Sequence, residues 1–149
     1  MAEKRMFSKS ILDSDAFLEL SSSAQALYMH LCIHADDDGF TDNPAHIMRA
    51  AKSSPYDLKS LSDKGFVICF PSGVVVITHW HIHNSIAKRM YQPTQYTAEK
   101  AILKKNENGL YSLKPPANNA KILSKEVTSL WTRKTISTPK DTAEFQSLS

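Results

Sequence analysis

The chain of 149 residues carries a formal net charge of +3, with 42% hydrophobic and 22% charged residues. This length suits one domain with an appendage and argues against two full domains. No stretch approaches the ~18 apolar residues of a membrane span, and no apolar run follows the first basic residues as a secretory signal requires. We therefore expect a cytoplasmic protein without membrane association, with Cys32 and Cys69 as buried thiols.

Charge is unevenly distributed along the chain. Residues 1–50 carry a net charge of −4, and residues 81–149 carry a net charge of +6. An acidic front and a basic back are expected of a protein that turns one face toward an anionic polymer, but solvated surface charge explains them equally well.

Helices are expected first. Asp13 or Ser14 can cap a short helix, and Ser22 with Gln25 three positions later is a capping-box pattern that predicts the start of a long one. The long helix should end at Asp36–Gly39, because glycine supplies a turn and adjacent carboxylates are unfavourable at the negative end of a helix. The residues expected to face the core are Phe17, Leu18, Leu20, Ala24, Leu27, Tyr28, Leu31, Cys32 and Ala35.

A short strand, two short helices and a hairpin should follow. Phe40–Thr41 leaves room for a very short strand. Asn43–Pro44 and Ser54–Pro55 each have the pattern of an N-cap followed by proline, and Asp57 completes the second cap. Two β-branched and aromatic runs flank the glycine-containing loop 71–73, which predicts a β-hairpin. The core residues expected here are Ile47, Met48, Ala51, Leu58, Leu61 and Trp80.

This order of elements is that of a winged helix-turn-helix domain. We predict an α+β fold with a winged helix-turn-helix over residues 1–84, a basic extension over 85–114 and a polar, mobile tail over 115–149.

The extension and the tail carry weaker patterns. Thr97 can cap a helix that runs through Leu103, and Asn108–Gly109 predicts a tight turn. In the tail, an apolar helical face favours a transient helix but could also dock on a partner. That face consists of Leu123, Val127, Leu130 and Trp131.

Several strings resemble one protein family. They are SAQALY at 23–28, HADDDGF at 34–40, KGFV at 64–67, and VITHW at 76–80 followed by IHN at 82–84. In combination they resemble the N-terminal domain of phage replisome organisers, the DnaD-like replication-initiation proteins of phages and prophages of Gram-positive bacteria. The resemblance covers approximately residues 1–114.

The resemblance implies a winged helix that binds double-stranded DNA at a phage origin in the bacterial host, self-associates, and recruits the host helicase or its loader through a C-terminal region. It also implies structural roles for Trp80, His83 and Asn84. After Lys114 the sequence lacks the extended amphipathic helices of a DnaD-like C-terminal domain. Helicase recruitment by this chain is therefore an open question.

The candidate DNA-binding residues lie on the second helix of the turn motif, which usually enters the major groove, on the wing and on the extension. The helix offers lysine for phosphates and serine and tyrosine for phosphates or base edges, but no bidentate arginine. Much of the affinity should therefore come from the extension, if its cations share the face of that helix. The candidates are Lys52, Ser53, Ser54, Tyr56, Lys59, Ser60, Ser72, Lys88, Arg89, Lys104 and Lys105.

Two patterns have the spacing of metal sites. His79, His81 and His83 would project from one side of an extended strand, and His30 and His34 stand one helical turn apart. No cysteine or carboxylate completes either set, so we expect no metal.

The acidic run Asp36–Gly39 resembles part of a calcium-binding loop but does not fit one. In the register of an EF-hand, His34 and Ala45 would occupy positions that require carboxylates. We interpret Asp36–Gly39 as a helix terminator, although an exposed acidic loop could also meet a basic partner surface. No phosphate loop, nucleophile elbow or Cys–His pair is present, so we predict neither an enzyme nor a cofactor.

The leading hypothesis is thus a non-enzymatic DNA-binding protein of phage or prophage replication initiation. A transcriptional regulator on the same fold is one alternative. A winged-helix protein-interaction module that no longer binds DNA is the other.

Overall fold

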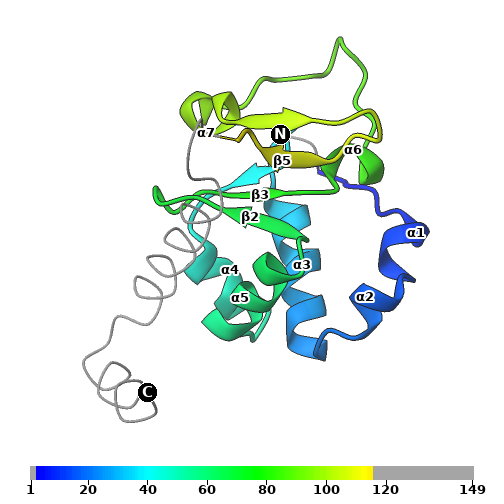
Figure 1. The fold of residues 1–149 in the computed structure, drawn as a ribbon, viewed down its shortest axis with the longest axis vertical. Helices are drawn as coiled ribbons and strands as arrows, with labels where there is room; N and C mark the ends of the chain where they lie inside the picture. Colours follow the sequence, from blue (N-terminus) through cyan, green and yellow to red (C-terminus); the bar gives the residue numbers. More distant parts are fainter. Residues whose placement is uncertain (1–2, 116–149) are drawn as a thin grey trace.

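The computed structural model describes residues 3–115, and the predicted tail after Pro115 lies outside them. Small antiparallel sheets and short helices make an α+β fold (Figure 1). No helix in the described range is long and apolar enough to cross a bilayer. The elements are α1 (Lys9–Leu12), α2 (Asp15–Leu18), α3 (Ser22–His34), β1 (Phe40–Thr41), α4 (Pro44–Ala50), α5 (Pro55–Asp63), β2 (Val67–Cys69), β3 (Val75–Ile77), α6 (Trp80–His83), α7 (Thr97–Ala101), β4 (Leu103–Lys105) and β5 (Tyr111–Leu113).

The helix caps agree with the sequence only in part. Ser14 caps α2 and Asp57 accepts the Ser54 N–H at 2.9 Å, as predicted. The capping box at Ser22 is wrong by one residue, because Ser21 is the N-cap of α3 and its hydroxyl accepts the Ala24 N–H. Asn43 makes no side-chain cap bond and has the left-handed φ of 49° instead.

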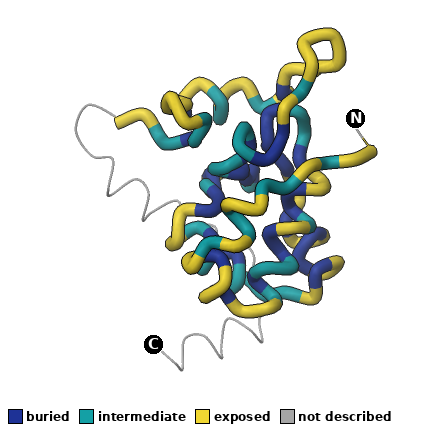
Figure 2. Tube along the Cα trace, turned by 90° about the vertical axis from the view of Figure 1, so that its right-hand side faces the viewer, coloured by how far each residue is buried: buried dark blue, intermediate teal, exposed yellow. Residues whose placement is uncertain are grey.

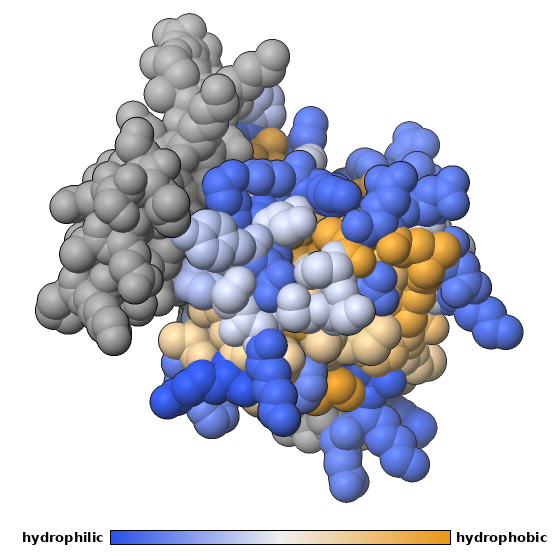
Figure 3. Space-filling model, turned by 90° about the horizontal axis from the view of Figure 1, so that it is seen from below, coloured by the Kyte–Doolittle hydropathy of each residue, from blue (hydrophilic) through white to orange (hydrophobic). Residues whose placement is uncertain are grey.

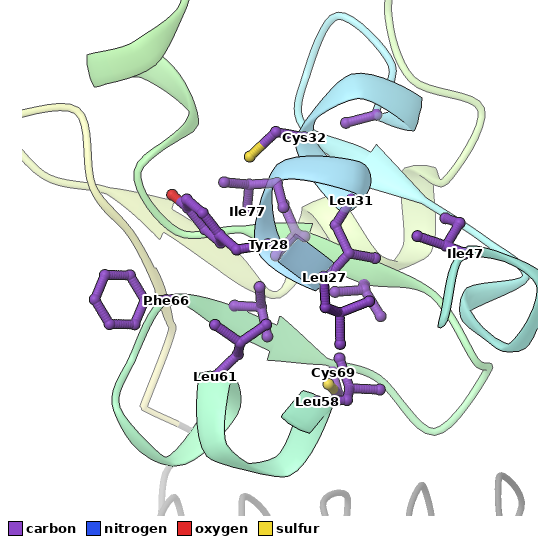
Figure 4. Close-up of a cluster of buried hydrophobic side chains, with 14 of the residues drawn as sticks. Leu27, Tyr28, Leu31, Cys32, Ile47, Leu58, Leu61, Phe66, Cys69 and Ile77 are labelled. Atoms are coloured by element: carbon purple, nitrogen blue, oxygen red, sulfur yellow. The ribbon is translucent and has the colours of Figure 1, made fainter. Parts of the chain in front are cut away.

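The three-stranded sheet has the order β1-β3-β2, all antiparallel, with β3 in the centre. Helices α3, α4 and α5 cover one of its faces (Figure 1). Figure 4 shows leucines of α3 and α5 pointing into the cluster beneath the sheet, with Ile77 of β3 above them. The residues expected to face the core are at most 8% exposed, which confirms the prediction for all of them except Leu18. Leu18 is 59% exposed, because it lies on the outer side of the single turn of α2, whose buried residue is Phe17.

The extension covers the other face of the sheet. Phe40 pairs with Val76 in register, and its ring packs against those of Tyr96 and Tyr111, with centroids 6.3 and 6.1 Å apart. All of β3 is buried as a result, which explains why its sequence is continuously apolar and does not alternate. The hairpin β4–β5 has the predicted turn at Gly109, whose φ is 85°. The predicted helix at Thr97 is present as α7, but its N-cap is Tyr96 and it is shorter than predicted, because it ends at Ala101 and Leu103 begins β4.

The histidine-rich segment is helical where an extended strand was predicted. Strand β3 ends at Ile77, and His79 to His83 wind into the single turn of α6. The turn places the Trp80 ring against Gly39, so closely that a Cβ on Gly39 would lie 2.6 Å from Trp80 Cγ. The indole Nε1–H donates to the Asp37 carbonyl at 2.9 Å. The strand thus ends before Trp80, whose large ring is buried.

Candidate nucleic-acid interface

Helices α4 and α5 meet at a tight turn. Lys52 has φ of 52°, and Ser53 donates from both its N–H and its hydroxyl to the Met48 carbonyl, at 2.9 and 3.3 Å. Because Leu58 and Leu61 bury one side of α5, the opposite side, with Tyr56 at 55% exposure, faces outward. The structure places all six helix candidates along α5 and the turn before it. Lys52, Tyr56 and Lys59 are exposed, whereas Ser53, Ser54 and Ser60 are half-buried.

The positive charge on this surface is partly neutralised by the chain itself. Lys59 Nζ lies 2.7 Å from the Asp63 carboxylate one turn later on α5. Lys64 Nζ lies 3.9 Å from Glu19. Arg49 and Lys52 are exposed and form no ion pair within residues 3–115. In Figure 3, which views this end of the molecule from below, apolar and weakly polar residues occupy much of the middle and hydrophilic residues its edges.

The loop of the β2–β3 hairpin is tied to the extension. Its turn closes with the Phe70 N–H donating to Val74 and the Gly73 N–H donating to Phe70, at 2.9 and 3.0 Å. The Ser72 hydroxyl donates to the Glu99 carboxylate of α7 at 2.8 Å. The candidate Ser72 is thus exposed, but its hydroxyl already has an acceptor.

The remaining candidates lie on the far side of the sheet. Lys88 and Arg89 belong to the loop 84–96, which projects at the top of Figure 1 and is almost entirely exposed in Figure 2. Lys104 and Lys105 stand exposed on β4. The condition that these four cations share the face of α5 is not met, because the sheet lies between them.

Comparison of the chain with protein-family models, with curated proteins and with solved structures finds no match. The geometry and chemistry of its own residues therefore carry the functional argument.

The acidic run forms an internal polar junction. Asp36 Oδ1 accepts the N–H groups of Asp38 and Phe40 at 3.0 Å, which ends α3 and confirms the helix-terminator interpretation. The other oxygen of Asp36 accepts the Thr94 hydroxyl at 2.5 Å. Asp37 binds Arg5 at 3.1 Å and the Gln92 N–H at 3.0 Å.

Asp38 is the centre of this junction and is only 3% exposed. Its carboxylate accepts the Tyr91 hydroxyl and the Thr94 N–H at 2.8 Å, and Lys100 Nζ lies 3.3 Å away. Its carbonyl accepts the Tyr111 hydroxyl at 2.9 Å. The alternative that this acidic run is exposed and meets a basic partner surface is therefore wrong, because donors of the chain itself bind these carboxylates.

The N-terminal arm, residues 4–8, closes over the same junction. The Arg5 guanidinium donates to the Ala35 carbonyl at 2.7 Å and stacks on Trp80 with its carbon 5.1 Å from the ring centroid. The Met6 N–H donates to Asn84 Oδ1 and the Ser8 N–H to His83 Nδ1, both at 2.9 Å. No pattern in the sequence predicted this arm.

His83 and His81 have structural partners, whereas the buried Nδ1 of His79 makes no hydrogen bond within the described residues. His83 Nδ1 accepts from Ser8, so in the neutral ring Nε2 carries the proton that bridges to the Tyr28 hydroxyl at 2.7 Å. Burial lowers the pKa of His83 to about 4, and neighbouring His79 adds to the shift. His81 Nε2 lies 2.9 Å from the Tyr111 hydroxyl, whose proton already goes to Asp38, so His81 donates. In the described part of the chain, no group of three His, Cys, Asp or Glu residues is arranged to hold a metal ion.

Both cysteines are buried, as predicted. Burial raises the pKa of both thiols, that of Cys69 to about 12. A protonated, buried thiol is a poor nucleophile, so neither cysteine has the properties of a reactive site.

Proposed function

We propose that residues up to Asn84 form a winged helix-turn-helix that binds double-stranded DNA. The observation that supports this most is the pair of short helices α4 and α5, joined by a tight turn and followed directly by the β2–β3 hairpin. In such a domain the second helix enters the major groove and the hairpin contacts the backbone. The β2–β3 hairpin is part of the three-stranded sheet, whose strand order is β1-β3-β2.

The exposed side of α5 supplies chemistry for both kinds of contact. Lys52 and Lys59 neutralise phosphates, and Tyr56 and Ser60 face base edges. Lys59 exchanges Asp63 for a phosphate at small cost, because an exposed ion pair contributes only about 0–1 kcal/mol. The Ser72 hydroxyl at the hairpin loop is a further candidate for the backbone.

The biological role proposed with this interface is initiation of phage or prophage replication. Its support is the resemblance of the strings at 23–28, 34–40, 64–67 and 76–84 to phage replisome organisers. Self-association and recruitment of the host helicase or its loader belong to the same proposal. A transcriptional regulator would use the same interface, and footprinting on the phage genome separates the two by showing protection at origin repeats or at a promoter.

A protein-interaction module is the second candidate. The observation in its favour is the neutralisation of Lys59 by Asp63 and of Lys64 by Glu19, which leaves α5 weakly charged. Such a module would show no salt-dependent binding to any duplex.

The test is fluorescence anisotropy with duplex fragments tiled over the genome that encodes the chain, measured over a series of salt concentrations. Each phosphate contact contributes a slope of about −0.9 in log affinity against log salt, so Lys59→Ala should flatten the slope by about one. Tyr56→Phe and Ser60→Ala should change which fragments are preferred and leave the slope nearly unchanged. Lys9→Ala, on the exposed side of α1, is the matched control. Absence of salt-dependent binding by the unaltered protein would reject DNA binding.

A further inference from the structure

The strongest positive charge of the described residues lies away from α5. Residues 84–115 hold six basic and two acidic residues, whereas residues 44–66 hold four and two. Lys88, Arg89, Lys104 and Lys105 are exposed and take part in no ion pair within residues 3–115. At the α5 end, by contrast, two of the four cations have a carboxylate partner.

The β4–β5 hairpin, which carries two of these cations, is anchored to the domain. Tyr111 donates from its N–H to the Thr78 carbonyl at 3.0 Å and from its hydroxyl to Asp38. Leu103 and Tyr111 belong to the same hydrophobic cluster as the leucines of α3 and α5. The cations of β4 are therefore carried on a fixed hairpin, so their direction relative to α5 is set by the fold.

Lys104 projects from the face of β4 opposite buried Leu103 and is therefore directed away from α5, whereas Lys105 is exposed at the end of the strand, near His81. The helices cover one face of the sheet, and the extension covers the face on which Phe40 meets Tyr96 and Tyr111. We expect a straight duplex that seats α5 in its major groove to run along the outside of the helices, on the opposite side of the sheet from β4. Bending a site of 20–30 bp by 40–90° costs on the order of 1–6 kcal/mol, so one short duplex could reach both surfaces only if its contacts with the extension offset that cost.

We infer that Lys88, Arg89, Lys104 and Lys105 form a second duplex-binding surface, so that one molecule holds two DNA segments, one at α5 and one at the extension. The second contact is to phosphates and is independent of sequence, since lysines on a strand and a loop neutralise charge without base readout. This inference rests on the proposed function for the α5 contact. It adds DNA bridging as an activity.

The experiment is a capture assay with the full chain. One biotinylated duplex is fixed on beads, and a second, fluorescent duplex of unrelated sequence is captured only if a protein molecule or assembly binds both. The unaltered protein should capture the second duplex. The variant K88A/R89A/K104A/K105A should reduce capture at least tenfold while it still binds a single duplex through α5. Either pair alone, K88A/R89A or K104A/K105A, should flatten the salt slope of capture by about two.

Controls separate this surface from other routes to bridging. Lys9→Ala should leave capture unchanged, and circular dichroism should show that the quadruple variant is folded. Light scattering gives the mass of each protein, because a dimer could also bridge through two copies of α5. Capture that persists in the quadruple variant would overturn the inference. Capture of a fluorescent single strand with no capture of a duplex would overturn it as well.

The two proposals fail differently. If K52A/K59A abolishes binding to single duplexes and the quadruple variant behaves as the parent, the α5 proposal stands and the bridging inference falls. If the quadruple variant loses all duplex binding and K52A/K59A has no effect, the extension is the DNA surface and the α5 proposal falls; with no second duplex site left, bridging by one molecule falls with it. No binding by the unaltered protein rejects both.

Discussion

The two faces of the central sheet are stabilised by different interactions. On the helix side, the leucines of α3 and α5 pack in a cluster from which water is excluded. On the extension side, apolar rings share the space with Asp38, Thr94 and other buried polar groups. The first face depends on shape and volume and the second on hydrogen-bond partners and protonation, so they should respond to different perturbations.

The largest expected effect is on the helix side. Leu31→Ala removes a fully buried side chain and should lower the free energy of unfolding by about 2 to 5 kcal/mol, because it loses apolar burial and leaves a cavity. Ile33→Ala, on the same helix but 44% exposed, is the matched control and should change it by less than about 1 kcal/mol. Urea denaturation measures both. If Leu31→Ala and the parent unfold at the same urea concentration, the buried face of α3 is wrongly assigned.

On the extension side, Asp38→Ala should cost about 2 to 3 kcal/mol. The change leaves the buried Thr94 N–H without an acceptor and removes the carboxylate from Tyr91 and Lys100. The exposed Glu107 of the β4–β5 turn offers a control in Glu107→Ala, which should be nearly neutral. If both variants unfold at the same urea concentration, the junction at Asp38 contributes no stability.

A smaller effect depends on pH. The folded-state pKa of His83, about 4, lies below its usual value of 6.5, so the folded protein binds fewer protons in this range. The stability contribution is complete above about pH 6.5 and is lost as the pH falls toward 4. A decrease from pH 7 to pH 5 should lower the free energy of unfolding by about 1.5 kcal/mol through this group.

The variant His83→Gln isolates that contribution, because burial lowers the pKa of His79 and His81 too. Its stability should fall less between pH 7 and 5 than that of the parent. An NMR titration of the folded protein gives the pKa of His83 directly. A value at or above 6.5 would contradict the bond from Ser8 to a neutral imidazole.

The smallest expected effect is that of a chelator. Both nitrogens of His83 have partners, and His81 donates to Tyr111, so their fixed contacts already explain these rings. The melting temperature should be the same with and without EDTA. A clear decrease with EDTA would show that a metal contributes to the fold.

The two faces also differ in how far the sequence predicted them. Apolar residues at helical spacing identified the buried side of α3, and the Asn–Pro and Ser–Pro patterns at Pro44 and Pro55 placed the starts of α4 and α5. The polar junction leaves no periodic pattern in the sequence. Asp38 lies more than fifty positions from each of its partners, which are Tyr91, Thr94 and Lys100. The continuous apolar run of β3 was a signal of burial on both faces.

The candidate site also divides into a part that the sequence placed correctly and a part that it could not place. The sequence placed the α5 candidates on one surface, because their spacing is local. It could not place Lys104 relative to Lys59, since that relation depends on how the extension packs on the sheet. The histidines misled for a similar reason, because burial of Trp80 turned an apparent strand into α6.

The late position of Tyr111 has a consequence for synthesis of the chain. Strands β1 to β3 precede residues 91–111 in the chain and so leave the ribosome before them, and one face of Phe40 and Val76 meets water until the extension emerges. An uncovered apolar face on a nascent chain is prone to aggregate or to bind a chaperone. Slow emergence of the stretch between β3 and β5 would prolong that state, whereas fast emergence would shorten it.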